Sequence, residues 1–153
     1  MVSAATLDRL DRFAPLLKDA GVDAYFAASA TSMGYLAGFH ESGGERFLIL
    51  AIHQDGRRRM ICPALSCSQA MRAGIEDVRP WRDGEDPLQH FRDLAEDWKL
   101  RSSMIAVDDD LQAKALLEMQ AVLPAALFRP GHAILAKIMR VKDKEELDLL
   151  QKA

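Results

Sequence analysis

Apolar positions follow two different periods along this chain. In five stretches an apolar side chain recurs every third or fourth residue, which places these side chains on one face of a helix. Shorter, compact apolar runs lie between these stretches and are typical of buried strands. The predicted helices are residues 5–20, 64–73, 87–98, 111–122 and a segment that follows Gly131. The predicted strands are residues 23–28, 47–52, 60–62, 77–79, 104–107 and 126–128.

The alternation of strands with helices predicts an α/β fold. Consecutive parallel strands need a crossover segment, so a chain that alternates in this way builds a largely parallel sheet. Two apolar runs around Asp55-Gly56 predict one antiparallel hairpin, in which both turn residues have positive φ. We therefore expect three layers, with a mixed, mostly parallel sheet and helices on both of its faces. Residues 35–39 fit a helix or an extended segment equally well.

Proline and aspartate mark the limits of the predicted helices. Asp86 followed by Pro87 is a typical helix start, because Asp accepts hydrogen bonds from free N–H groups and Pro has no N–H to leave unpaired. Pro15 falls inside the first predicted helix, where it removes one hydrogen bond. It predicts either a kink or a helix that begins nearer Arg12.

A final predicted helix, residues 143–153, has a start signal and no stop signal. Asp143 is in the position of an N-cap, with Glu146 three residues later. No glycine or proline follows before the sequence ends. We expect residues 1–139 to form one domain. We expect residues 140–153 to be a linker and a first helix that lead into a domain absent from this sequence.

Length and charge exclude several classes of partner. The 153 residues correspond to one ordinary domain. The net charge of −3 offers no basic surface for nucleic acid, and the one basic run, residues 57–59, is interpreted as a solvated turn and strand end. No apolar run approaches the roughly 20 residues of a membrane span. We therefore expect neither nucleic acid nor a membrane as partner.

Few residues point to metal or thiol chemistry. Cys62 and Cys67 lack the further Cys or His that a zinc site needs, and are interpreted as reduced, mostly buried thiols of a cytoplasmic protein. The four histidines are scattered and are interpreted as surface or packing residues. The three aspartates at residues 108–110 follow a strand and could hold a hard cation. Capping of the following helix is the favoured interpretation.

The loop before the hairpin is the best candidate for a functional site. It combines an imidazole, two carboxylates, a guanidinium and two glycines beside an aromatic segment. Polar groups on a loop held by a rigid scaffold are typical of a binding site, and the alternative is a plain flexible connection. The loop runs His40-Glu41-Ser42-Gly43-Gly44-Glu45-Arg46.

Three segments carry a family resemblance through their order and spacing. They are Asp19 to Ala24 (DAGVDA), Tyr35 to Phe39 (YLAGF) and Ile138 to Leu147 (IMRVKDKEEL). Together they resemble the N-terminal domain shared by the creatinase, prolidase and Xaa-Pro aminopeptidase family. The resemblance covers essentially the whole chain.

The resemblance implies a role without catalysis for this chain. In that family, activity belongs to a following "pita-bread" domain that holds two metal ions, commonly Mn or Co, so no catalytic or metal-binding residue is expected here. The implied parent is a cytoplasmic hydrolase of the aminopeptidase P or prolidase (Xaa-Pro dipeptidase) type. The domain would contact its own C-terminal catalytic domain and a second identical subunit. It would restrict or bind short proline-containing peptides.

On that resemblance, His40, Glu41 and Arg46 line the path of the substrate, and Tyr35 and Phe39 support their loop. Two other parents remain open. One is a creatine- or ectoine-type hydrolase with the same N-terminal domain, and the other is a free-standing protein-binding module that has lost catalysis. A fourth possibility, a free-standing ligand-binding domain, predicts that residues 143–153 pack back on their own sheet.

Overall fold

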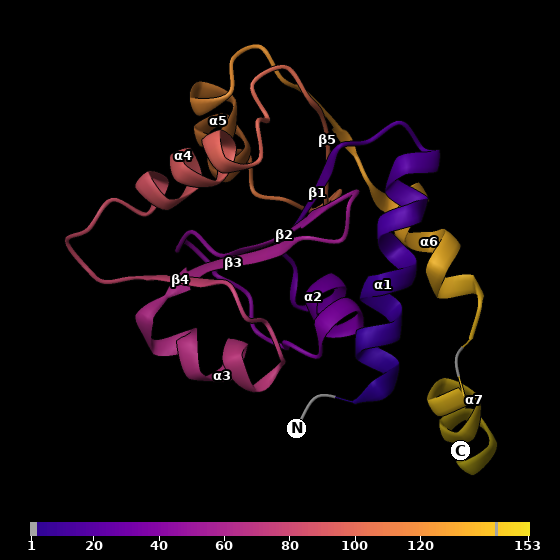
Figure 1. Cartoon of the computed structure of the whole chain (residues 1–153). Coiled ribbons are helices and arrows are strands. Elements are labelled where there is room, and N and C mark those ends of the chain that lie inside the picture. Colours follow the sequence, from indigo (N-terminus) through magenta and orange to yellow (C-terminus); the bar gives the residue numbers. More distant parts are fainter. Residues whose placement is uncertain (1–2, 143) are drawn as a thin grey trace.

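The chain folds around one six-stranded sheet with the strand order β4-β3-β2-β1-β5-β6 (Figure 1). The structure is a computed structural model that describes residues 3–142 and 144–153, so the predicted cap Asp143 lies outside the described residues. The strands are β1 Ala24–Ala27, β2 Ile49–His53, β3 Arg58–Pro63, β4 Val78–Trp81, β5 Met104–Val107 and β6 Leu127–Pro130. The α-helices are α1 Ala4–Asp19, α2 Ala30–Ala37, α3 Cys67–Arg72, α4 Pro87–Asp97, α5 Ala113–Val122, α6 His132–Arg140 and α7 Lys144–Lys152.

Strand β2 runs against the other five strands. It is antiparallel to both of its neighbours, β1 and β3, whereas the pairs β1–β5, β5–β6 and β3–β4 are parallel. The prediction of a mixed, mostly parallel sheet is therefore confirmed. As a consequence, the carboxyl ends of five strands and the amino end of β2 lie at the same edge of the sheet.

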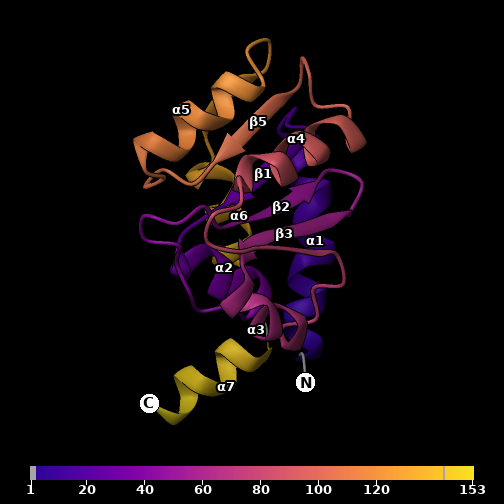
Figure 2. The same cartoon turned by 90° about the vertical axis from the view of Figure 1, so that its left-hand side faces the viewer.

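Helices cover both faces of the sheet, as predicted. Helices α1, α2, α3 and α6 bury their apolar residues against one face, and α4 and α5 bury theirs against the other (Figure 2). Successive side chains of a strand point to opposite faces. In β1, Tyr25 accordingly meets the ring of Phe13 from α1 at 5.2 Å, and Phe26 meets the ring of Phe91 from α4 at 5.5 Å. Both pairs have the edge-to-face geometry that aromatic rings prefer.

The β2–β3 hairpin forms at the predicted residues with a different turn. Gly56 has a φ of +94°, but no non-glycine residue of this hairpin has a positive φ, so that part of the prediction is wrong for Asp55. The N–H of His53 donates to the carbonyl of Arg57 at 2.8 Å, and the N–H of Gly56 donates to the carbonyl of His53 at 2.9 Å. A loop of this length needs one left-handed residue at its end, which glycine supplies.

Two helices differ from the sequence-based expectation. Helix α1 is continuous through Pro15, so the alternative start near Arg12 is wrong. Pro15 is exposed, whereas Phe13 and Leu17 on the opposite side are fully buried and hold the helix on the sheet. The undecided segment at residues 35–39 is helical as far as Ala37, where α2 ends.

The predicted helix at residues 64–73 begins with a 3-10 turn, Ala64–Ser66, before α3. Of the three side chains expected to pack there, only Ala70 is buried. Leu65 is 89% exposed and Met71 is 63% exposed. The predicted helix is confirmed, but the predicted packing of Leu65 and Met71 is wrong, because both side chains face solvent.

Helix α7 projects from the end of the molecule beside the N-terminal segment, where the hydroxyl of Ser3 donates to Glu145 at 3.5 Å (Figures 1 and 2). None of its residues is buried, and Leu147, Leu149 and Leu150 are between 48% and 68% exposed. A free-standing ligand-binding domain predicted the opposite arrangement, with this segment packed on the sheet. Within the described part of the chain, no helix has the length and apolar character needed to cross a membrane.

Candidate functional site

A cavity of about 280 Å³ lies at the edge of the sheet where the five parallel strands end. β1 and β5 are neighbours there, although the chain leaves β1 toward β2 and reaches β5 only after β4. Open α/β sheets bind ligands outside the carboxyl ends of their strands, at a point where the strand order reverses in this way. We call this hollow the switch-point cavity; its lining residues are 28–31, 42–49, 110–112, 114, 115 and 118.

Asp108 fills the crevice between β1 and β5 beside this cavity. Its side chain is almost fully buried and accepts four hydrogen bonds. Two come from the backbone N–H groups of Ala28 and Ser29, at 2.7 and 2.9 Å. Two come from the hydroxyls of Tyr25 and Ser32, at 2.6 Å each. Burial and the neighbouring charge of Asp108 raise the pKa of Tyr25 far above its ordinary value, so Tyr25 stays protonated and donates.

The other two aspartates, Asp109 and Asp110, have different surroundings. Asp109 accepts a hydrogen bond of 3.0 Å from the backbone N–H of His132, the first residue of α6. Asp110 is exposed and lines the switch-point cavity. The expected capping of the following helix is therefore wrong, because α5 begins after Gln112 with no side-chain cap. Asp108 instead binds the segment before α2, and Asp109 binds the first N–H of α6. Among the residues described, no three His, Cys, Asp or Glu side chains are grouped to hold a metal ion.

Arg46 is the one predicted site residue that lines the switch-point cavity. Its guanidinium forms an ion pair with Asp83 at 3.0 Å and lies 5.9 Å from the ring centre of Trp81. The loop before it is compact, since the N–H of Arg46 donates to the carbonyl of Gly43 at 2.9 Å. The ion pair and the turn together fix the end of the loop against the chain that follows β4.

His40 and Glu41 lie at the beginning of the same loop, outside the lining of the cavity. A Cβ atom at Gly34 would come within 2.5 Å of Nδ1 of His40, so a larger residue at position 34 would force the exposed imidazole to move from its place on α2. Glu41 accepts a hydrogen bond of 2.7 Å from the hydroxyl of Ser66. Both ends of the loop are thus held by contacts, and the residues between them are exposed or half-buried.

Tyr35 and Phe39 point into the molecule. The hydroxyl of Tyr35 donates to the carbonyl of Ile138 in α6 at 3.2 Å, and the guanidinium of Arg9 lies 4.6 Å from the centre of its ring. Phe39 is fully buried in the core. The structure therefore brings the five predicted residues to one loop and its base, and brings only Arg46 to the cavity.

Sequence reasoning missed the residues that α5 contributes to the cavity. Lys114 and Glu118 are one helical turn apart and both line it. The signal was present, because residues four apart share a helix face and α5 is the first helix after the carboxyl end of β5. It was overlooked because neither residue belongs to a recognisable motif.

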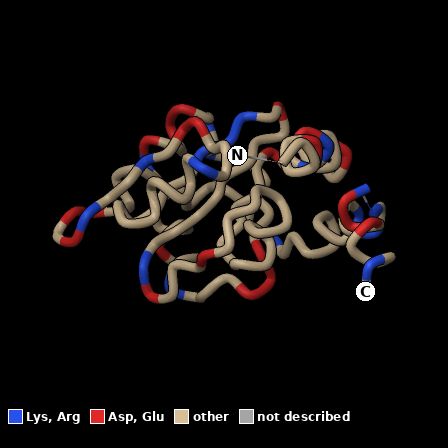
Figure 3. Tube along the Cα trace, turned by 90° about the horizontal axis from the view of Figure 1, so that it is seen from below, with Lys and Arg blue, Asp and Glu red and all other residues tan. Residues whose placement is uncertain are grey.

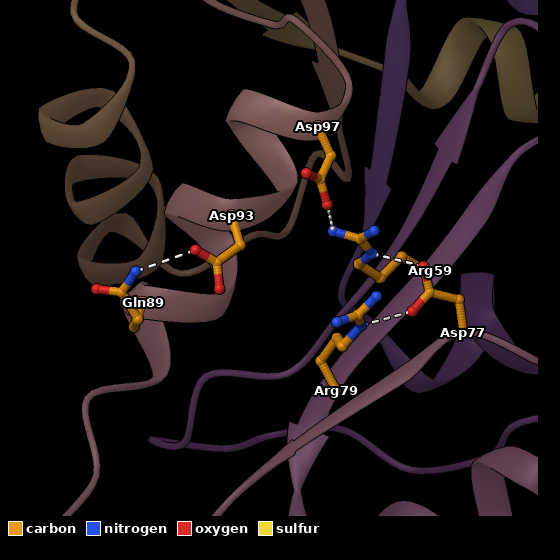
Figure 4. Close-up of polar contacts among 6 residues, drawn as sticks. All are labelled: Arg59, Asp77, Arg79, Gln89, Asp93 and Asp97. Carbon is orange, nitrogen blue, oxygen red and sulfur yellow. Dashed lines mark hydrogen bonds and ion pairs between the residues drawn. The ribbon is translucent and has the colours of Figure 1, made fainter.

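Arg59 is buried, and the interpretation of residues 57–59 as a solvated turn is wrong for this residue. Only 6% of its side chain is exposed, and it forms ion pairs with Asp77 at 2.7 Å and Asp97 at 2.9 Å (Figure 4). Asp77 also binds Arg79 at 2.6 Å. Burial alone would raise the pKa of Asp77, but the hydrogen bonds and charges of Arg79 and Arg59 outweigh it and lower that pKa.

The two remaining arginines of the run are also paired with acids. Arg57 binds Asp55 and Arg58 binds Asp11, each at 2.9 Å. The three arginines of residues 57–59 border a second hollow of about 700 Å³ beside the hairpin turn. Because every guanidinium already has a carboxylate partner, this hollow is a weak candidate for an anion site. Figure 3 shows basic and acidic segments interspersed along the chain rather than gathered on one side.

The two thiols do not form a disulfide. Cys62 is fully buried at the end of β3, and Cys67 is half-buried at the start of α3. Burial, helped by the nearby Cys67 and Glu41, raises the pKa of Cys62 to about 12. A thiol with so high a pKa is not a nucleophile near neutral pH.

Two curated proteins are similar to this chain over different lengths. "Putative dipeptidase YkvY" of Bacillus subtilis (strain 168) is 26% identical over 149 residues, which are 96% of this chain and 41% of YkvY. The "Xaa-Pro dipeptidase" of Lactobacillus delbrueckii subsp. lactis is 31% identical over 94 residues, which are 61% of this chain and 25% of that protein. The chain therefore spans less than half the length of the curated relatives that it matches.

A solved structure and a family profile agree with this similarity. The crystal structure of a dipeptidase from Pyrococcus horikoshii OT3 superposes with a TM-score of 0.81 at 27% identity, covering 92% of this chain and 38% of that one. The profile of the Creatinase/Prolidase N-terminal domain matches residues 9–141. That match includes every strand of the sheet and the loop at residues 40–46. The chain belongs to the creatinase/prolidase N-terminal domain family.

Proposed function

We propose that this chain is the non-catalytic N-terminal domain of a Xaa-Pro metallopeptidase of the prolidase or aminopeptidase P type. The family match supports a domain of this kind, and the name of the Lactobacillus relative supports Xaa-Pro dipeptides as substrates. The share of YkvY that the chain spans, 41%, supports a parent with a further domain. In this proposal the parent is a cytoplasmic dimer, and the domain contacts both its own catalytic domain and a second identical subunit.

The proposed catalytic metals, two Mn or Co ions, belong to residues beyond this chain. The described residues do not fit such a site, because they contain no group of three possible ligands. Bound divalent metal ions supply an activated water for peptide hydrolysis in enzymes of this chemistry. The contribution of this chain is to shape access to that site.

The observation that carries the proposal is the loop at residues 40–46, which is polar, outward-facing and fixed at both ends. Glu41 is held by Ser66, and Arg46 is held by Asp83. Holding polar groups in place before a ligand arrives lowers the cost of binding. We propose that His40, Glu41 and Arg46 border the mouth of the active site and restrict it to short peptides. Phe39 and Tyr35 anchor the base of the loop.

The test uses the full-length protein that carries this domain. We expect the triple variant His40→Ala, Glu41→Ala, Arg46→Ala to have a higher KM for Xaa-Pro dipeptides and to cleave longer peptides more readily. The matched control is Arg79→Ala, an exposed arginine that also pairs with an acid but lies outside this loop. An unchanged KM and unchanged length preference in the triple variant would show that the loop has no such role.

The same protein decides between the alternative parents. Hydrolysis of creatine or ectoine, without hydrolysis of Xaa-Pro dipeptides, would favour the other hydrolases. Absence of any hydrolysis with Mn or Co added would favour a protein-binding module. The exposed Leu65 and Met71 are the observation that favours this second function, because apolar side chains in solvent are typical of contact surfaces.

A further inference from the structure

We propose that the switch-point cavity is a binding site for a small zwitterion, an amino acid or a dipeptide, within this domain. Its place in the fold is the first argument. The loops after β1 and β5 both line it, at the point of the sheet where α/β proteins bind ligands. Its volume of about 280 Å³ is just below the range of about 300–1,000 Å³ for drug-sized ligands, so the ligand is small.

The carboxylate of Asp108 occupies the position at which many such folds bind an anion. An anionic ligand at a switch point commonly accepts hydrogen bonds from the start of the helix after the first strand. Here Asp108 accepts the N–H groups of Ala28 and Ser29 and the hydroxyl of Ser32. A nucleotide phosphate would have to displace this buried carboxylate. The cavity therefore does not suit a phosphate-bearing ligand.

The remaining charges of the lining suit a ligand with an ammonium group and a carboxylate. Glu45, Asp110 and Glu118 line the cavity, and their side chains form no hydrogen bond or ion pair with any described residue. Lys114 is likewise without a side-chain partner in the described chain, whereas Arg46 is neutralised by Asp83. Three carboxylates favour an ammonium group, and one lysine favours a single carboxylate at the other end of the ligand.

A smaller, apolar part of the lining lies between these charges. Phe47, Leu48 and Ile49 enter the lining from the start of β2, and Leu111 and Ala115 enter it from the side of α5. Their side chains suit the hydrocarbon part of an amino acid or a dipeptide. The lining is more polar than that of a typical drug-binding pocket, which favours a charged ligand over an apolar one. The proposal does not depend on the peptidase function of the parent, because it concerns the isolated chain.

The test is a titration of the ¹⁵N-labelled chain with L-alanyl-L-proline, followed by amide chemical shifts in NMR. We expect saturable shifts at Thr31, Gly44 and Ala115, which border the cavity. The neutral analogue N-acetyl-L-alanyl-L-prolinamide has the same backbone without the two charges. We expect it to bind about tenfold more weakly or worse, since each lost charge-assisted hydrogen bond weakens binding by about that factor.

Two variants test the roles of the charges. Glu118→Gln should weaken binding of the dipeptide through its ammonium group, and Lys114→Met should weaken it through its carboxylate, each about tenfold. The matched controls are Glu96→Gln on α4 and Lys137→Met on α6, which are exposed and distant from the lining. The same spectra show whether each variant is folded. Equal shifts with the neutral analogue, shifts elsewhere on the chain, or no shifts at all would overturn the proposal.

Discussion

The buried carboxylate of Asp108 joins segments that are distant in the sequence. It joins the end of β5 to β1 through one hydrogen bond and to the segment around the start of α2 through three, and its partners lie 76 to 83 residues away in the sequence. An ionised acceptor makes hydrogen bonds about twice as strong as neutral ones. The cost of losing this carboxylate should therefore exceed that of an ordinary surface residue.

We predict that Asp108→Asn lowers the free energy of unfolding by about 2–4 kcal/mol, because the amide N–H₂ of Asn cannot accept the bonds that one carboxylate oxygen now accepts. Urea unfolding followed by circular dichroism measures the change. Asp109→Asn is the control, since Asp109 is exposed and accepts one backbone N–H, which the amide oxygen of Asn can still accept; it should cost less than about 0.5 kcal/mol. A loss no larger for Asp108→Asn than for Asp109→Asn would contradict this account.

The ion pairs of Arg59 give the fold a dependence on pH. The pKa of Asp77 is lowered in the folded state, so its ionised form stabilises the fold above the unfolded carboxylate pKa of about 4. This stabilisation is lost as the pH falls through the lower, folded pKa. We predict that Asp77→Asn costs about 2 kcal/mol at pH 7, and that its difference from wild type shrinks below about pH 4.

Urea titrations at a series of pH values measure this difference. Asp93→Asn is the matched control, because Asp93 is exposed and accepts a hydrogen bond from Gln89 on its own helix (Figure 4). It should change stability by less than about 0.5 kcal/mol at every pH. A constant difference between Asp77→Asn and wild type down to pH 3 would show that the charge of Asp77 is not what stabilises the fold.

At the residue scale, sequence reasoning identified the right chemical groups and missed their partners. Asp108 and Asp109 were expected to cap the helix that follows them. Asp108 instead binds the segment before α2, and Asp109 binds the start of α6, since both partners are reached through the sheet rather than along the chain. Arg59 was expected in solvent and is buried between two acids from distant segments. Contacts of this kind depend on the register of the strands, which local patterns do not contain.

At the scale of the elements, helix α1 tolerates a residue that should break it. Pro15 has no N–H to donate to the carbonyl four residues earlier, and its ring crowds that carbonyl. Burial of Phe13, Ala14 and Leu17 against the sheet offsets this cost, which a periodicity argument alone does not weigh. Burial of apolar side chains therefore stabilises this helix at the point where a backbone hydrogen bond is missing.

We predict that Pro15→Ala raises the free energy of unfolding by about 1–2 kcal/mol. It restores the missing hydrogen bond, and the extra freedom of alanine in the unfolded chain cancels part of the gain. Thermal unfolding would show a higher Tm. Lys18→Ala, at another exposed position of α1, should change stability by less than about 0.5 kcal/mol. A lower Tm for Pro15→Ala would mean that the proline relieves strain in this helix.

Element positions were well predicted where the apolar period was clear. Each predicted strand and helix exists, and the Asp86-Pro87 start is correct, with the side chain of Asp86 accepting the N–H of Leu88 at 3.0 Å. The exposure of Leu65 and Met71 was not foreseen. A short helix at the edge of a sheet can bury only one narrow side, and the sequence does not say which side that is.

At the scale of the molecule, α7 adds no buried residue to the fold, although the hydroxyl of Ser3 donates to the carboxylate of Glu145 at 3.5 Å. Because none of its side chains is buried, we predict that a chain ending at Val141 has the same free energy of unfolding as the full chain, within about 0.5 kcal/mol. It should also self-associate less in sedimentation velocity, since three exposed leucines are removed. A substantial loss of stability would show instead that α7 packs on the domain in solution.

The overall architecture could be predicted because each level of the pattern agreed with the others. Alternating strands and helices implied the mostly parallel sheet, and the family resemblance covered the whole chain. The position of β2 between β1 and β3 was not predicted, and neither was the cavity that this order creates beside β1. Strand order is set by long-range pairing, so it emerges only with the complete fold.

The reversal of β2 has a consequence for how such a domain can diverge. It brings the loop at residues 38–48 to the edge where the five other strands end, so this loop lies beside the segments that follow β1 and β5. Insertions and substitutions there leave the strand register untouched. Proteins that share this domain can therefore acquire new binding preferences through substitutions in a few loops at this edge. The residues that fold the domain lie in the strands and in the two hydrophobic cores.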